Sequence, residues 1–236
     1  MTLTVTVAAG VMTGEQDEAL SEARVAALFT RSDGTYRFAR WGRPLVPAVF
    51  GLPEVEERAL IETVRAVASL GPGAAAEDPD MGANFLVFFC SDWTELRAVP
   101  GLPKLVPDLE RLTAVLAAAG ANQYRIFGFD PDRDPGREGQ PGAIRVCITL
   151  LRLDDNLEAL GPRGLALSQT VMGLLLWSDH AFTRESTVAT FEGTERTLVK
   201  PWVQAVIRAA YSPGLPDAAE EEWHARQLAR LAAGAL

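Results

Sequence analysis

Short apolar runs and amphipathic segments alternate along this chain, and no other feature of the sequence constrains the fold as strongly. Residues 85–90 form a continuous apolar run, which is typical of a strand buried on both faces. Residues 54–70 instead repeat apolar side chains every three or four positions, with Val55, Leu60 and Val64 in one stripe, as expected for a helix with one buried face. The alternation predicts an α/β (α+β) fold, a layered mixed sheet with packed helices.

The other elements follow from the same patterns and from proline and glycine breakers. Extended segments are expected at residues 2–8, 36–41, 45–50, 124–129 and 143–153. Further helices are expected after residues 13–15 and at 105–119, 165–176, 198–211 and 218–233. Polar loops are expected at 71–82 and 130–141.

Length and composition favour a single soluble domain over residues 1–236, because 48% of the residues are hydrophobic and can form one core. We expect it to contain an N-terminal strand and helix (1–35), a core (36–211) and a C-terminal helix (212–236). The net charge of -9 should repel nucleic acid and anionic lipid. A nucleic-acid partner is therefore not expected.

No apolar run approaches the length that spans a bilayer, so membrane insertion is not expected. The first basic residue is Arg24, and residues 1–11 alternate like a strand, unlike a signal peptide. A cytoplasmic location is the resulting expectation; an exported or periplasmic location applies if the chain is a processed form.

The only two cysteines, Cys90 and Cys147, each lie in an apolar run, which predicts buried free thiols. A bridge between them stays open if their strands are neighbours with suitable geometry. Cys90 and His180 are the one pair that could supply a thiolate and an imidazole base, and Asp179 stands beside that histidine. No nucleophile turn surrounds Cys90, so a structural cysteine and a surface histidine are favoured.

Two other motifs have a simpler interpretation. The acidic loop at 130–136 resembles a calcium loop, but Pro135 stands where glycine is required, which favours a solvated connection. No phosphate-binding glycine motif is present in the sequence, and no cofactor is expected.

An acidic cluster beside an aromatic residue consists of Glu220, Glu221, Glu222 and Trp223. Such a cluster could anchor a protein partner, although solvated helix ends have the same composition.

Several segments occur in a recognisable order: Arg40, Trp41 and Pro44 before a strand, then residues 83–90, 143–153, 167–179 and 202–216. In this order they resemble a bacterial family of uncharacterised function that is itself similar to degenerate zincins, the zinc metallopeptidases. The resemblance covers about residues 37–223 and implies a zincin-like core in residues 36–211.

In an active zincin, two histidines one helical turn apart bind zinc and a glutamate acts as the base. If Gly173 is placed on the glycine of that motif, the histidine positions hold Ala166 and Thr170, the glutamate position holds Leu167 and the third-ligand position holds Leu176. A shift of one residue brings Gln169 to the second histidine position. The chain has only two histidines, His180 and His224, so a three-histidine site is excluded and no metal is expected.

The leading hypothesis is therefore a pseudoenzyme, a non-catalytic zincin-like module for binding or assembly, with another protein as the expected partner. The alternative is a peptidase-like hydrolase that uses carboxylates or the Cys90 and His180 pair. The ligand and the oligomeric state stay open at this stage.

Overall fold

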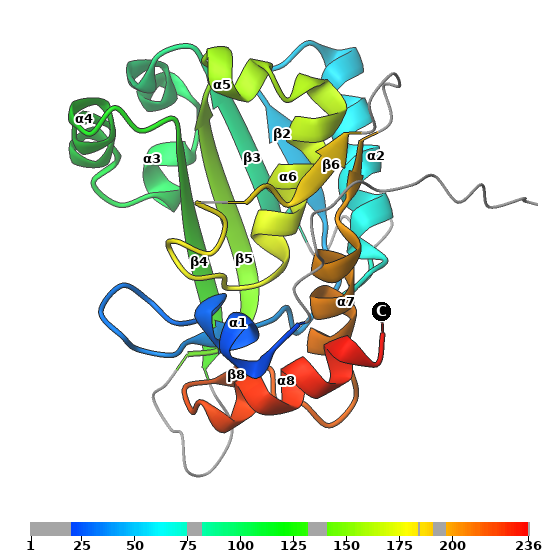
Figure 1. Ribbon diagram of the computed structural model, residues 1–236. Helices are drawn as coiled ribbons and strands as arrows, with labels where there is room; N and C mark the ends of the chain where they lie inside the picture. The colour runs from blue at the N-terminus through cyan, green and yellow to red at the C-terminus, as the bar shows by residue number, and fades with distance from the viewer. Residues whose placement is uncertain (1–19, 75–81, 132–140, 184, 191–196, 236) are drawn as a thin grey trace, which may run out of the picture.

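The computed structural model describes residues 20–74, 82–131, 141–183, 185–190 and 197–235 (Figure 1). The predicted strand at 2–8 and most of the predicted loops at 71–82 and 130–141 lie outside these residues. Helices and a mixed sheet make up the fold, which confirms the predicted fold class. Within the described residues, no helix is long and apolar enough to cross a lipid bilayer.

The main sheet has four strands in the order β2 (Pro47–Phe50), β3 (Phe85–Cys90), β5 (Pro141–Arg152) and β4 (Gln123–Pro131). β2, β3 and β5 run parallel, and β4 pairs antiparallel with β5 at one edge. The parallel strands lie inside two layers of helices, which explains the unbroken apolar run in β3.

Side chains of β3 alternate between two hydrophobic clusters, one on each face of the sheet. Phe85, Val87 and Phe89 face the larger cluster, which contains α2 (Glu54–Ala68), α6 (Gly161–Leu174) and α7 (Pro201–Ala210). The alternate residues face the smaller cluster, formed with η1 (Trp93–Ala98), α3 (Leu102–Leu105) and α4 (Leu109–Ala118). The result is three layers, with the sheet in the middle (Figure 1).

The two ends of the described chain pack together and form part of the larger cluster. α1 (Glu22–Ala27) lies against α8 (Trp223–Ala233), and β1 (Phe38–Ala39) pairs antiparallel with β8 (Ala218–Ala219) (Figure 1). Short elements complete the fold: α5 (Asp155–Glu158), β6 (Val188–Thr190) and β7 (Thr197–Val199).

Several sequence predictions need correction. The predicted helix at 198–211 begins only at Pro201, because residues 198 and 199 belong to β7. The predicted helix at 105–119 is divided, because Val106 is extended before Pro107 and α4 begins at Leu109. The predicted helix at 218–233 begins only at Trp223, because Ala218 and Ala219 pair with β1. The periodicity predicts Val55 in the buried stripe of α2, but this residue is 80% exposed, and the buried residues begin at Leu60.

Candidate functional site: a basic pocket beside strand β4

The structure does not bring Cys90 and His180 together. Cys90 ends β3 on the face covered by η1, α3 and α4, and its Sγ lies 3.4 Å from the carbonyl oxygen of Leu151. Burial raises the pKa of this thiol to about 12. His180 follows α6, which covers the other face of the sheet. A thiolate and imidazole pair is therefore not formed.

Cys90 and Cys147 do lie on neighbouring strands, but in positions that do not face each other. Phe85 is paired with Cys147 and Cys90 with Arg152, so the two cysteines are offset along the sheet. Their side chains also belong to the clusters on opposite faces. Both are free thiols, as the apolar runs predicted.

We expect both thiols to be unreactive in the folded protein. Burial raises the pKa of Cys147 to about 11 and that of Cys90 to about 12, so at pH 8 only about one Cys147 thiol in 1,000 and one Cys90 thiol in 10,000 is ionised. Titration with a chromogenic disulfide reagent should detect no thiol in native protein within minutes and two after unfolding in guanidinium. Rapid labelling of native Cys90 would contradict this assignment.

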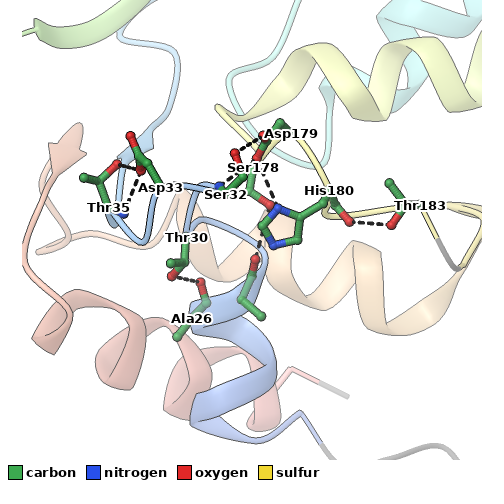
Figure 2. Close-up of polar contacts among 10 residues, drawn as sticks. Ala26, Thr30, Ser32, Asp33, Thr35, Ser178, Asp179, His180 and Thr183 are labelled. Carbon is green, nitrogen blue, oxygen red and sulfur yellow. Dashed lines mark hydrogen bonds and ion pairs between the residues drawn. The ribbon is translucent and has the colours of Figure 1, made fainter.

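Asp179 and His180 form a polar cluster with Ser32 (Figure 2). Asp179 Oδ2 accepts a hydrogen bond from Ser32 Oγ at 2.7 Å, and its Oδ1 lies 3.1 Å from His180 Nδ1. The hydrogen bond from Ser32 lowers the pKa of the Asp179 carboxyl. The carboxylate thus lies between hydroxyl and imidazole, whereas in a hydrolytic triad the imidazole occupies the middle. The hydrogen bond between Ser32 and Asp179 therefore joins the turn at 31–35 to the loop after α6.

The positions compared with the zincin motif lie in or near α6 and serve packing. Ala166, Leu167 and Thr170 are buried, and Thr170 Oγ1 donates to the carbonyl oxygen of Ala166 at 2.7 Å. Gly173 faces the Phe85 ring, and Leu176 lies beyond the helix, which ends at Leu174. Among the described residues, no group of three His, Cys, Asp or Glu side chains could hold a metal ion.

A pocket of about 570 Å³ opens between β4, the loop after α6, the turn at 31–37 and β8. β4 is an edge strand, and its residues are only partly covered. The lining combines three arginines, five aromatic rings and two carboxylates: Arg31, Arg37, Arg125, Phe38, Tyr124, Phe127, Phe129, Trp177, Asp179 and Glu220.

Arg125 is the central polar residue of this pocket. Its Nη2 donates to Gln123 Oε1 at 3.2 Å and to Gln169 Oε1, and its buried Nε has no hydrogen-bond partner. Burial lowers the pKa of the guanidinium to about 10, so it remains charged at neutral pH. Among the described residues, no carboxylate forms an ion pair with it. Its described partners are neutral amides.

The other two arginines differ in their pairing. Arg37 Nε lies 3.6 Å from Glu220 Oε1, which leaves that pair electrically neutral. Arg31 has a buried Nε without a hydrogen-bond partner, and within the described part of the chain it joins no ion pair. The pocket therefore carries positive charge that its own carboxylates do not neutralise, although the whole chain is acidic.

A second, smaller pocket of about 310 Å³ adjoins the first and shares Gln123, Met172, Ser178 and Asp179 with it. Its wall is rich in hydroxyl groups, including those of Ser168, Ser186 and Thr187. Gln169, only 3% exposed, lines this pocket and contacts Arg125 of the first. The cluster of Gln123, Arg125 and Gln169 therefore lies at the boundary between the two pockets.

Comparisons with protein-family models, with curated proteins and with solved structures found no match for this chain.

The residues of the acidic cluster at the start of α8 do not lie together on one surface. Glu220 lines the pocket and pairs with Arg37, whereas Glu221 and Glu222 are exposed and Trp223 is 49% exposed. Of the residues singled out in the sequence, Leu176, Asp179 and Glu220 line the pocket. Arg125 was missed, although the alternation of residues 123–129 places it on the same face as Phe127 and Phe129, which pack against the core.

Proposed function

We propose that this chain is a non-catalytic binding protein on a zincin-like scaffold, and that its pocket beside β4 takes a small organic anion. The scaffold part of the proposal rests on the sequence segments that occur in the same order as in the degenerate zincin-like family. The ligand part rests on one observation: the guanidinium of half-buried Arg125, whose Nε atom is buried without a hydrogen-bond partner, has no described carboxylate partner.

A buried charge is costly unless an opposite charge and hydrogen bonds compensate it. Gln123 and Gln169 offer Arg125 only neutral amide oxygens. A bound carboxylate or phosphate would supply the missing charge, and the planar guanidinium suits both groups. Arg31 adds a second positive charge in the same lining.

The aromatic part of the lining indicates the rest of the ligand. Phe127, Phe129 and Trp177 offer apolar surface beside the arginines, so an anion with an apolar or aromatic body would bury more area than a bare ion. The volume of about 570 Å³ fits a small molecule, and the net charge of -9 opposes a long polyanion.

Binding without catalysis is supported by the arrangement of the reactive groups. Cys90 and His180 are on opposite sides of the sheet, so that form of the hydrolase alternative has no geometric basis. The carboxylates of the pocket are already engaged, Asp179 by Ser32 and His180 and Glu220 by Arg37.

The test compares benzoate, phenyl phosphate and inorganic phosphate with neutral benzyl alcohol and cationic benzylamine, by calorimetry and thermal shift. We expect the aromatic anions to bind and raise the melting temperature, and the neutral and cationic compounds to have no effect. Arg125→Gln should weaken binding about tenfold or more, because a charge-assisted hydrogen bond is lost.

Arg58→Gln is the matched control, because Arg58 is an exposed arginine on α2 whose side chain is 70% exposed. It should leave binding unchanged. If Arg125→Gln fails to fold, Arg31→Gln provides the second variant, with the same expected direction. Equal binding of anions and neutral analogues, or full binding by both pocket variants, would refute the proposal.

A further inference from the structure

A third concave surface lies along the first turns of α6, away from the basic pocket. It is a groove of about 730 Å³ between α2, α5 and the first turns of α6. Its apolar lining includes Val55, Ala59 and Ala66 from α2 and Leu157, Pro162 and Leu165 from the facing elements. We refer to this surface as the α2–α6 groove.

The residues of α2 that line this groove form an apolar stripe, and its length and small side chains suit the binding of a second helix. Val55, Ala59 and Ala66 follow one face of α2 and span about 16 Å, or three helical turns. Val55 is 80% exposed, and the two alanines are exposed as well. Small side chains allow a second backbone to approach closely, as in helix-in-groove recognition.

The charges of the lining indicate the chemistry of the partner. Glu56, Glu62 and Glu158 line the groove against one cation, Arg163. None of these glutamates forms an ion pair within the described residues. A basic segment would be attracted, whereas a second copy of this acidic chain on the same face would place like charges together.

We infer that the α2–α6 groove docks a basic amphipathic helix of a partner protein. The apolar stripe of that helix covers Val55, Ala59 and Ala66, and its lysine or arginine side chains meet the glutamates of the lining. The inference is independent of the anion pocket, because it uses a different surface.

The probe is a fluorescent synthetic helix of about 14 residues with leucines at i, i+3, i+4 and i+7 and lysines on the flanks, measured by anisotropy. A matched peptide carries glutamate in place of each lysine. We expect the lysine peptide to bind and the glutamate peptide to bind at least about tenfold more weakly.

Two surface variants test the location. Val55→Asp and the pair Glu56→Lys with Glu62→Lys should each weaken binding of the lysine peptide about tenfold or more, without loss of the circular dichroism spectrum. Val115→Asp is the control, because Val115 is a 57% exposed valine on α4 in the opposite layer. It should leave binding unchanged.

A photo-crosslinking version of the lysine peptide should label residues 52–66 or 153–167. Labelling confined to other residues, or equal binding of both peptides, would overturn the inference. A homodimer in sedimentation equilibrium that Val55→Asp dissociates would also overturn it, because the occupant would then be a second copy.

Discussion

Replacing Gly173 by alanine is expected to lower the free energy of unfolding by about 2–3 kcal/mol, the upper part of the range of about 1–3 kcal/mol seen when a methyl group is forced into a packed core. A Cβ at this position would lie 2.4 Å from Cε2 and 2.8 Å from Cζ of Phe85. The ring has little room to move, because Phe85 is 1% exposed and lies beside the Trp41 ring. The same region also holds the hydrogen bond from Trp41 Nε1 to the Gly173 carbonyl oxygen at 2.9 Å.

The free energy is measured by urea unfolding and the melting temperature by thermal unfolding, both followed by tryptophan fluorescence. The melting temperature should fall by roughly 5–10 °C. Gly164→Ala is the control in the same helix, because its Cβ would meet only Leu160 and Thr197 at 3.6 and 3.7 Å. That change should leave stability equal or raise it by up to about 1 kcal/mol, since alanine favours helix. Equal effects of the two substitutions would show that contact with Phe85 does not set the need for glycine.

Replacing Arg40 by alanine should cost still more, about 3–5 kcal/mol, because it breaks a largely buried network and leaves several polar groups without partners. Arg40 Nη1 donates to the carbonyl oxygens of Ala210 at 2.7 Å and Ser212 at 3.3 Å, and Nη2 donates to that of Leu215 at 2.9 Å. Its Nε donates to Asp217 Oδ1 at 2.8 Å, and its side chain is only 14% exposed.

The expected fall in melting temperature is roughly 10 °C for this chain length. Arg40→Lys should recover only a small part of the loss, because one ammonium cannot reach carbonyl groups that lie in different directions. Arg58→Ala, which removes a surface pair with Glu54, should change stability by less than about 0.5 kcal/mol. A loss for Arg40→Ala as small as that for Arg58→Ala would contradict the role of this network.

Local sequence patterns correctly predict those elements whose formation depends on neighbouring residues in the chain. The strand at 85–90 and the start of the helix at Glu54 agree with the sequence prediction, because burial and helix periodicity act on consecutive residues. The helix expected at 105–119 is divided instead, through the proline at 107. Residues 218–219 form a strand because a distant partner, β1, pairs with them.

The candidate site could be predicted only in fragments. Arg31, Arg125 and Glu220 come from segments that are far apart in the sequence, and only the assembled fold brings them to one pocket. The position of Arg125 on the inner face of its strand was readable from alternation, but its neutral partner Gln169 comes from α6. His180 and Cys90 have the side chains of a base and a nucleophile, but residue type alone does not indicate which face of the sheet each occupies.

The pairing of the first and last described elements has a consequence for biosynthesis. Phe38 is paired with Ala219, and Glu22 of α1 forms an ion pair with Arg226 of α8 at 3.0 Å. A ribosome must synthesise all the residues between β1 and β8 before these partners of the early segments exist. Apolar surface around α1 and β1 must therefore wait, uncovered or protected by a chaperone, until β8 and α8 have left the exit tunnel. This part of the core closes late in biosynthesis.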